Sequence, residues 1–276
     1  MRFLIVFFLV IGFSSLAYAE TPYERVMKTG IIRCGYILWP PYMDKDITSG
    51  NFKGLNFDYM EKLAESLGLK VEWAVEIMPG LQVETLRSGK ADAICSAEGP
   101  MMPKTSSQLI YTRPINICPF DLYVRPDEKR FIDKAAINKP NVKIAVLEED
   151  ASDIISRIHF PLAERMPVPP NAISGQMMMD VISKKSDVLI MDPLTMAEFF
   201  KNNHEQLKKL PLGEPVAVIP MTLSVLRPSG RDLADLLNQG MNNMQNYGMD
   251  EAIFKRYEAQ YEGEIFYRPA LPYKDE

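Results

Sequence analysis

The residues that could carry nucleophilic or metal chemistry in this chain are few and widely spaced. The 276-residue sequence contains three cysteines, Cys34, Cys95 and Cys118, and two histidines, His159 and His204. They form no C-x-x-C motif and no Cys/His cluster, so the spacing typical of zinc ligands is absent. No Ser/His/Asp or Cys/His arrangement typical of a nucleophilic enzyme occurs elsewhere. We therefore expect no catalytic residue, no metal and no cofactor.

The first nineteen residues have the pattern of an export signal. Arg2 precedes an apolar run over 3–13, and an A-x-A sequence stands at 17–19. A short basic start, about 7–15 apolar residues and an A-x-A ending describe a secretory signal peptide. A membrane-spanning helix needs about 20 apolar residues, roughly twice this run. We expect cleavage after Ala19, no lipid anchor because no cysteine follows, and a soluble periplasmic protein that begins at Glu20.

Export to an oxidising compartment makes disulfide bonds possible. Cys34 and Cys95 lie in predicted core strands, and Cys118 lies in a third extended segment. One pair could be bridged, Cys34 with Cys95 being the best choice if their strands are neighbours. Buried free thiols that act as small apolar side chains are an equally good interpretation.

The composition is that of an ordinary globular protein. Hydrophobic residues make up 47% and charged residues 24% of the chain, which excludes a disordered or low-complexity protein. The chain has 31 basic and 36 acidic side chains, which gives a formal net charge of -5. Proteins that bind nucleic acid gain affinity by neutralising phosphates, so an acidic balance argues against a nucleic-acid partner.

Strand and helix signals alternate along the chain and then begin again. The first series predicts strands over 31–37, 70–75 and 92–95, with helices over 56–67 and 81–88. The second series predicts strands over 142–147 and 188–191, with helices over 151–158 and 175–183. Such alternation predicts βαβ units and a mostly parallel sheet. The restart predicts an α/β protein with two lobes.

A short pattern recurs in both series. The segment LRSGKADAI at 86–94 ends a helix and opens a strand, and VISKKSDVLI at 181–190 does the same in the second series. In both, a polar turn brings an aspartate, Asp92 or Asp187, to the start of the strand. We interpret these two acids and Asp58 as structural, because each begins a helix or strand and can accept hydrogen bonds from nearby backbone N–H groups.

Two extended segments, near 117–124 and 221–226, are predicted to join the lobes. The helices that follow have too little apolar surface for a domain of their own, so we expect them to pack on the first lobe. The predicted organisation comprises a signal peptide, a discontinuous first lobe and an inserted second lobe. The limits of these parts are 1–19, then 20–117 with 226–276, and 118–225.

Several motifs occur in a fixed order over about residues 28–258. They are WPPY at 39–42, GLNFDY at 54–59, LGLKVE at 67–72, SGKADA at 88–93, Asp187 with Asp192, and LLN at 236–238 with Gly248. Together they resemble the signature of family 3 extracellular solute-binding proteins, the periplasmic receptors of polar amino-acid ABC importers.

The resemblance implies a type II periplasmic-binding-protein fold, in which two hinge strands join two α/β lobes. In such proteins a small-molecule ligand binds in the cleft between the lobes and its contacts to both drive their closure. It also implies a monomeric receptor that presents the closed, loaded form transiently to an ABC permease in the inner membrane and catalyses no reaction.

The resemblance places aromatic residues at the mouth of the first lobe. Trp39 and Tyr42 fall there and could hold a flat or cationic ligand by stacking or cation–π attraction. In the alternative interpretation Tyr42 belongs to the core and Trp39 alone lines the cleft. Tyr36, on the same strand exit, is a second-rank candidate, at a position where some amino-acid receptors carry an acidic residue.

The loop over 96–105 departs most from the family pattern. Amino-acid receptors have small hydroxyl residues here, a place that Ser96 fills, followed by an arginine that grips the ligand's α-carboxylate as a bidentate fork. Proline or threonine stands at the arginine's place, depending on the direction of counting, and Lys104 between them could supply a point charge. Glu98 occupies a normally neutral position and is either a ligand contact or a solvated loop acid.

The second lobe also departs from the family pattern, again with acidic residues where an anion would bind. After the strand over 142–147 the family usually has a glycine and hydroxyl residues at a helix N-terminus, which can receive an anion. This chain has Glu148, Glu149 and Asp150 there, which are either ordinary capping acids or a barrier to a ligand carboxylate. Asp192 matches the family aspartate that pairs with the ligand's ammonium group.

The expected cleft therefore has aromatic walls, acids at Glu98, Asp150 and Asp192, and no arginine clamp. Because a buried carboxylate is costly unless it is paired, these acids predict a small polar ligand that bears an amine or another cationic centre. Two other functions stay open. One is an enzyme similar to periplasmic cyclohexadienyl dehydratases, whose carboxylate-bearing substrates, prephenate and arogenate, fit poorly with the missing arginine. The other is a sensory or accessory binding module.

Overall fold

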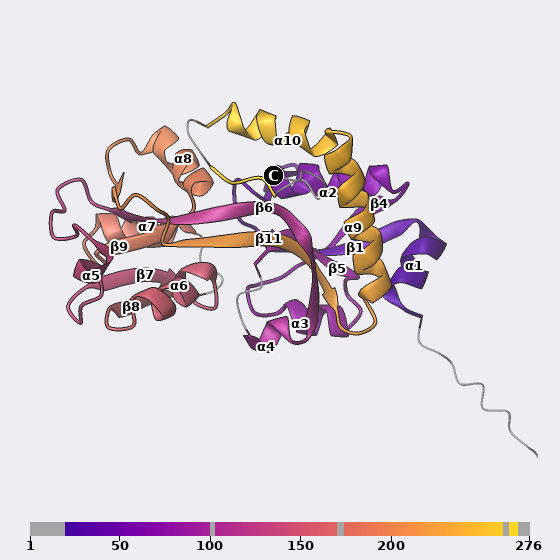
Figure 1. Cartoon of the computed structure of the whole chain (residues 1–276), viewed down its shortest axis with the longest axis horizontal. Coiled ribbons are helices and arrows are strands. Elements are labelled where there is room, and N and C mark those ends of the chain that lie inside the picture. Colours follow the sequence, from indigo (N-terminus) through magenta and orange to yellow (C-terminus); the bar gives the residue numbers. More distant parts are fainter. Residues whose placement is uncertain (1–19, 100–102, 170–173, 262–264, 270–276) are drawn as a thin grey trace, which may run out of the picture.

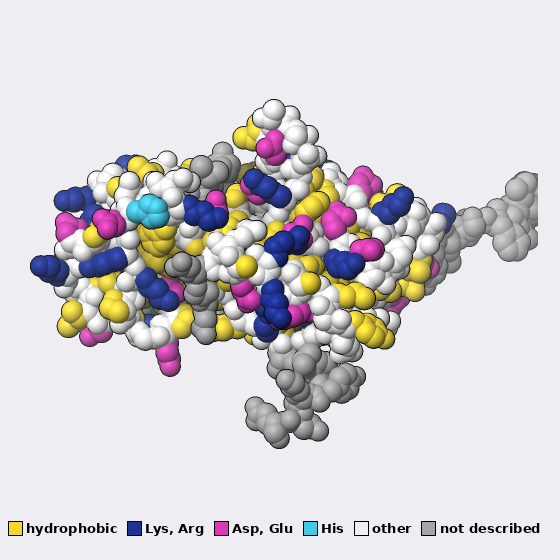
Figure 2. Space-filling model, turned by 90° about the horizontal axis from the view of Figure 1, so that it is seen from above, with side chains coloured by type: hydrophobic (Ala, Val, Ile, Leu, Met, Phe, Trp, Pro, Cys, Tyr) yellow, Lys and Arg dark blue, Asp and Glu magenta, His cyan; other side chains and the backbone are white. Residues whose placement is uncertain are grey.

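The computed structural model describes residues 20–99, 103–169, 174–261 and 265–269. The predicted signal peptide, residues 1–19, lies outside the described residues. Within them, no helix combines the length and the apolar character needed to cross a bilayer. Side chains of Lys and Arg are interspersed with those of Asp and Glu on the face shown in Figure 2.

The described residues form one sheet of nine strands that runs along the molecule (Figure 1). The strand order is β4-β1-β5-β11-β6-β9-β7-β8, and β10 also pairs with β6. Strand β1 runs parallel to β4 and β5, and β7 runs parallel to β8 and β9. The bounds are β1 (Ile31–Tyr36), β4 (Lys70–Glu76), β5 (Ala93–Glu98), β6 (Leu109–Val124), β7 (Lys143–Leu147), β8 (Glu164–Val168), β9 (Val188–Met191), β10 (Lys208–Lys209) and β11 (Ala217–Leu226). A separate hairpin pairs β2 (Asp44–Lys45) with β3 (Phe52–Lys53).

Helices cover both groups of parallel strands (Figure 1). In the group of β1, β4 and β5, helix α2 packs against α9 and α10, which come from the end of the chain. In the group of β7, β8 and β9, helices α6 and α7 pack on the strands, and α8 contacts β6. The helices are α1 (Pro22–Thr29), α2 (Leu55–Ser66), α3 (Gln82–Arg87), α4 (Pro103–Ser106), α5 (Lys134–Ile137), α6 (Ala151–His159), α7 (Ser174–Ile182), α8 (Pro193–Asn202), α9 (Arg231–Asn246) and α10 (Met249–Glu258).

The two antiparallel strands β6 and β11 belong to both groups and connect them (Figure 1). They extend over 109–124 and 217–226, further than the predicted segments. The difference has a physical reason, because Pro114 and Pro119 interrupt the strand signal in β6 and proline cannot donate to a ladder. Pro114 faces Thr222 where the β6–β11 register shifts, so the proline sits at a bulge, a place that tolerates it.

The recurring sequence pattern makes the same backbone connection in both groups of strands. In the first, Asp92 N donates to Arg33 O at 2.8 Å, and Arg33 N donates to Asp92 Oδ2 at 2.7 Å. In the second, Asp187 N donates to Lys143 O at 2.7 Å, and Lys143 N donates to Asp187 Oδ2 at 3.0 Å. Each aspartate thus fastens the start of one parallel strand to its neighbour, which agrees with a structural role.

Cys34 on β1 and Cys95 on β5 form a disulfide bond, while Cys118 is a free, buried thiol. The bond joins neighbouring parallel strands, since Cys34 stands opposite Ala93 in the β1–β5 ladder. The bridged alternative for these two cysteines is therefore confirmed.

Asp58 fastens α2 to α10 and supplies a first prediction. Its Oδ2 accepts hydrogen bonds from the Tyr257 hydroxyl at 2.6 Å and from Arg256 Nη2 at 2.8 Å. We expect Asp58→Ala to lower the free energy of unfolding by about 1–2 kcal/mol, because the charged acceptor is lost and the site is partly exposed. Urea unfolding measures the change. Glu65→Gln, which breaks the exposed Lys62–Glu65 pair, is the matched control and should change stability by less than about 0.5 kcal/mol.

Candidate ligand-binding site

Side chains from both groups of strands meet at the middle of the sheet. Tyr42 comes from the turn between β1 and β2, Cys118 from β6, and Asp192 from the residue between β9 and α8. The Tyr42 hydroxyl lies 3.4 Å from Cys118 Sγ and also lies beside Asp192. All three side chains are fully buried. The contact therefore joins the first lobe, a connecting strand and the second lobe.

Asp192 is a buried acid whose hydrogen bonding is incomplete. Its Oδ1 caps helix α8 by accepting a hydrogen bond from Thr195 N at 2.8 Å. Its Oδ2 is buried and has no hydrogen-bond partner of ordinary geometry among the described residues. Burial raises the pKa of Asp192 to about 6, and hydrogen bonding by Thr195 and Tyr42 offsets this rise only in part. Burial thus makes the charged form of Asp192 costly in the folded protein.

The ring of Trp39 lies next to this group. Its centroid is 4.6 Å from that of Tyr42, at an interplanar angle of 31°, and 6.4 Å from that of Phe120 on β6. Trp39 is partly exposed, whereas Tyr42 is fully buried. Trp39 therefore retains free ring surface, and Tyr42 belongs to the core while its hydroxyl reaches the lobe boundary.

Tyr36 has a different environment from Trp39 and Tyr42. Its ring centroid lies 4.9 Å from that of Phe52 and 6.0 Å from that of Trp73, both in edge-on geometry. Only 4% of Tyr36 is exposed. The structure thus places this second-rank candidate in an aromatic cluster of the first lobe and does not bring its ring to Asp192.

Glu98 is buried at the end of β5, and the donors that its carboxylate contacts among the described residues are neutral. Its Oε2 accepts from Gln82 Nε2 and its Oε1 accepts from Ser224 Oγ, both at 2.6 Å. Burial raises the pKa of Glu98, and the two hydrogen bonds counteract this rise. No ion pair with Glu98 occurs among the described residues. The solvated-loop interpretation does not describe this side chain, which is 9% exposed.

The acidic turn before α6 touches the first lobe. The Glu149 carboxylate occupies the space where a side chain at Gly80, in the loop between β4 and α3, would begin. Gly80 has a φ of 87°, so glycine suits this position both for its backbone and for the close approach. Asp150 is the N-cap of α6 and is partly exposed, and its surroundings raise its pKa by burial. The lobes are therefore in contact on this side as well.

The family model of bacterial extracellular solute-binding proteins, family 3, matches residues 32–260. The chain belongs to this family. Its structure is similar to that of an ancestral amino-acid-binding protein described as a precursor of cyclohexadienyl dehydratase, with a TM-score of 0.73, 20% identity, and coverage of 86% of this chain and 99% of the other. A sequence comparison with curated proteins finds no significant match.

Two further solved structures are similar to this solute-binding protein. The cysteine-binding protein from Campylobacter jejuni has a TM-score of 0.73 and 15% identity, covering 89% of this chain and 96% of the other. An arginine-bound amino-acid ABC transporter substrate-binding protein from Streptococcus pneumoniae has a TM-score of 0.71 and 15% identity, covering 87% and 100%. The predicted fold, two α/β lobes joined by two hinge strands, is confirmed.

Ser96 and Lys104 are the remaining predicted site residues of this solute-binding protein. Ser96 Oγ accepts a hydrogen bond from Ile37 N at 2.9 Å, and its carbonyl accepts from Asn56 Nδ2 at 2.6 Å, so Ser96 already has partners. Lys104 belongs to α4, and its side chain lies outside the described part of the chain. The structure therefore brings Trp39, Tyr42 and Asp192 together.

Some residues that sequence reasoning missed contact the candidate site residues or lie buried on the connecting strand β6. Gln82 and Ser224 hold Glu98, and Cys118 contacts Tyr42. Asn116 on β6 is fully buried, and neither amide atom has a hydrogen-bond partner among the described residues. The sequence carries no signal for them, because Ser224 and Glu98 are 126 positions apart and lie in no shared motif.

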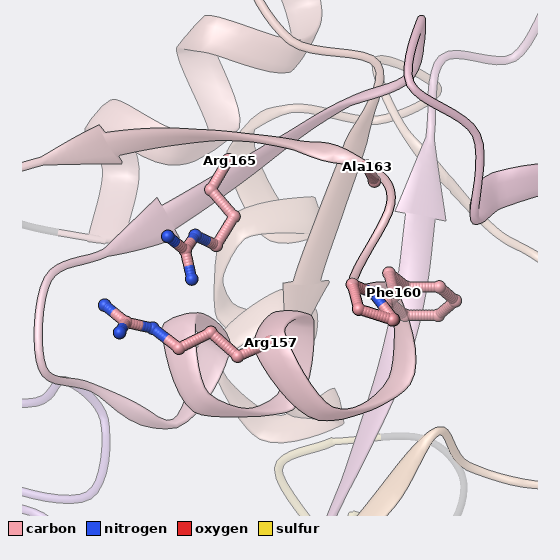
Figure 3. Close-up of a pocket in the computed structure, with 5 residues that line it drawn as sticks. Arg157, Phe160, Ala163 and Arg165 are labelled. Carbon is pink, nitrogen blue, oxygen red and sulfur yellow. The ribbon is translucent and has the colours of Figure 1, made fainter.

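Two surface cavities of this solute-binding protein lie apart from these residues. One, of about 240 Å³, is in the second lobe and is lined by Arg157, Phe160, Pro161, Ala163 and Arg165 (Figure 3). There Asp153 already pairs with Arg157 at 2.7 Å. The other, of about 700 Å³, is lined by Pro126, Phe200, His204, Glu205, Leu207, Lys208 and Lys209. Neither contains a predicted site residue.

Proposed function

We propose that this protein is the periplasmic receptor of an ABC importer and captures a small polar solute that bears an amine or another cationic centre. The observation that carries the proposal is the buried Oδ2 of Asp192, which accepts no hydrogen bond of ordinary geometry from the described residues and has only the Tyr42 hydroxyl beside its carboxylate. A carboxylate removed from water is costly unless a positive partner or several donors compensate it. An ammonium group supplies both the charge and the donors.

The surroundings of Asp192 favour a cation over an anion. Trp39 offers partly exposed ring surface, and a cation held against an indole gains about 0.5–2 kcal/mol. Glu98 adds an acid that accepts hydrogen bonds from neutral donors among the described residues, and Asp150 adds an acid whose pKa burial raises. Proline or threonine, depending on the direction of counting, stands at the place of the carboxylate-gripping arginine of amino-acid receptors, and Lys104 between them could supply only a point charge. The ligand therefore need not be an α-amino acid.

Capture follows from the position of these groups on both lobes. The proposed first lobe comprises 20–117 and 226–276, and the proposed second lobe comprises 118–225. A ligand that contacts Trp39 in the first and Asp192 in the second favours the closed arrangement over the open one. Cleavage after Ala19 releases the receptor into the periplasm, where the loaded monomer engages the permease transiently.

Two other functions receive less support. One structural relative is described as a precursor of cyclohexadienyl dehydratase, so a dehydratase is one alternative function. However, the carboxylates of prephenate or arogenate would face Asp192 and Glu98 without an arginine. A turnover assay with prephenate separates this enzyme from a receptor. A sensory module would bind the same ligand, and neighbouring permease and ATPase genes would favour import.

Isothermal titration calorimetry against amines, amino acids and organic acids tests the proposal. We expect an amine-bearing solute to bind, and Trp39→Ala to weaken that binding about 2- to 30-fold through the lost cation–π contact. Trp73→Phe is the matched control, because Trp73 donates from Nε1 to Glu61 Oε1 at 2.8 Å in the distant aromatic cluster. It should leave the Kd unchanged. Tight binding of a dicarboxylate would contradict the proposal.

A further inference from the structure

The chain makes a contact with the second lobe after its last helix has ended. Tyr261 follows α10, and its hydroxyl donates to Glu198 Oε2 on α8 at 2.9 Å. The ammonium group of Lys201, one turn further along α8, lies 4.3 Å from the centroid of the Tyr261 ring. Lys201 also pairs with Glu198 at 2.9 Å. One aromatic side chain from the C-terminal region therefore contacts two neighbouring charged groups of α8.

Residues 265–269 then lie against the hinge and the first lobe. Tyr267 exchanges both backbone hydrogen bonds with Ile117 of β6, at 2.8 and 2.9 Å. Ile265 and Phe266 are buried, and Gln245 Nε2 on α9 donates to Pro269 O at 3.2 Å. In Figure 1 the yellow end of the chain lies beside β6, between α10 and α8. Tyr261 is thus held by well-packed segments on both sides.

Groups from both lobes affect the pKa of Glu198. Burial raises its pKa, but Lys201, Tyr261 and Lys53 outweigh this and leave the pKa lowered. Lys53 lies on β3 of the first lobe, and Tyr261 comes from the helix that packs on α2. The charged form of Glu198 is therefore favoured in the arrangement in which the lobes are together.

Helix α8 connects this contact to the candidate ligand site. Asp192 caps the N-terminus of α8, and Glu198 follows six positions later, about 9 Å along the axis of an α-helix. A short helix moves as one body, so a group that holds Glu198 also fixes the place of Asp192. The same structure has Glu149 against Gly80 and Tyr42 beside Asp192, so the Tyr261 contact accompanies the contacts between the lobes.

We propose that Tyr261 is a positioning residue for the ligand site, acting through Glu198 to hold α8, and with it Asp192, in the closed arrangement of the lobes. The effect on affinity rests on the proposed binding function, whereas the effect on closure does not. The contact adds to the connection that β6 and β11 make between the lobes and to the contacts of Glu149 with Gly80 and of Tyr42 with Asp192. Tyr261 lies one position beyond residues 32–260, which match the family model.

Tyr261→Phe tests the link, because it removes the hydroxyl and keeps the ring that faces Lys201. We expect the Kd for the amine found by calorimetry to rise about 3- to 10-fold, the range for a part-buried hydrogen bond to a charged acceptor. Glu198→Ala should give a similar loss, and the double variant should lose less than the product of the two. Glu198→Gln, which keeps an acceptor, should restore most of the affinity.

Tyr267→Phe is the matched control, since Tyr267 contacts Ile117 through its backbone and loses only a hydroxyl. Its Kd should equal that of the unchanged protein. An affinity in Tyr261→Phe that is unchanged or tighter than in the unchanged protein would overturn the proposal.

A second measurement requires no ligand. Spin labels on Ile47→Cys and Lys139→Cys, both at exposed positions in different lobes, report the distance between the lobes by pulsed electron paramagnetic resonance. We expect Tyr261→Phe to shift the ligand-free distances toward the open arrangement, and Tyr267→Phe to leave them unchanged. Identical distributions in all proteins would overturn the link. If no amine binds but the distances shift, the proposed function fails and the link stands.

Discussion

Asp192→Asn is expected to weaken amine binding by at least about 100-fold, because it removes the charge that compensates a buried cation. The same substitution should make the ligand-free protein more stable above pH 6. Asp192 has a folded pKa of about 6 against an ordinary value of 3.8, so the folded state binds a proton more tightly than the unfolded chain. Stability from this group is therefore greatest at low pH and is lost as the pH rises through 6.

The size of that gain follows from the pKa difference. Roughly two pKa units correspond to about 3 kcal/mol, which is the upper limit for the benefit of a neutral side chain at pH 8. Asparagine also serves well as an N-cap, so the hydrogen bond from Thr195 N can persist. We expect Asp192→Asn to raise the free energy of unfolding by about 1–3 kcal/mol at pH 8 and by almost nothing near pH 4.

Urea unfolding at both pH values and calorimetry with the amine measure the two effects. Asp235→Asn makes the same chemical change on the exposed face of α9 and is the matched control for both. It should shift stability by less than about 0.5 kcal/mol and leave the Kd unchanged. A stability loss in Asp192→Asn at pH 8, or an unchanged affinity, would show that Asp192 has a structural role only.

Removal of the disulfide should have the largest effect on stability. Cys34 and Cys95 are 61 positions apart, and a loop of this size restricts the unfolded chain by about 4 kcal/mol in the chain-entropy account. We expect Cys34→Ala with Cys95→Ala to lower the free energy of unfolding by about 2–4 kcal/mol, as measured by urea unfolding.

A reductant provides the internal control for this prediction. Dithiothreitol should destabilise the unchanged protein by a similar amount and should have no effect on the double variant, which has no bond to break. A loss below about 1 kcal/mol in both experiments would mean that packing between β1 and β5 dominates over the covalent link.

The regular parts of the fold were predictable from local patterns. The strand predicted over 31–37 is β1 (Ile31–Tyr36), and the helix predicted over 56–67 is α2 (Leu55–Ser66). Both are long enough for their hydrophobic periodicity to be distinctive. Strand β8 was not predicted, because its sequence ERMPV is mostly exposed and contains a proline, as is common at a sheet edge. The two-residue strands β2, β3 and β10 are too short to show a hydrophobic periodicity.

The site was predictable only where a single position carries a family signature. Asp192 was predicted from its place after a core strand, and Trp39 from the WPPY motif, and both stay predictions. The partners of Tyr42 and Glu98 could not be found, because Cys118 and Ser224 are 76 and 126 positions away and only the folded sheet brings them close. The contact of Tyr261 with α8 could not be predicted either, since no sequence pattern links the end of α10 to α8.

The packing of α9 and α10 on α2 has a consequence for the order in which the protein would fold during the proposed export. The strands β7, β8 and β9 with α6 and α7 come from one unbroken stretch of chain, so they can assemble as soon as that stretch emerges. Cys34 and Cys95 both emerge within the first hundred residues and can be oxidised early. The core around α2, however, would stay open until the last helices have emerged. A chain arrested before α9 would therefore expose apolar surface on its earliest part, which is where we expect a periplasmic chaperone or protease to act.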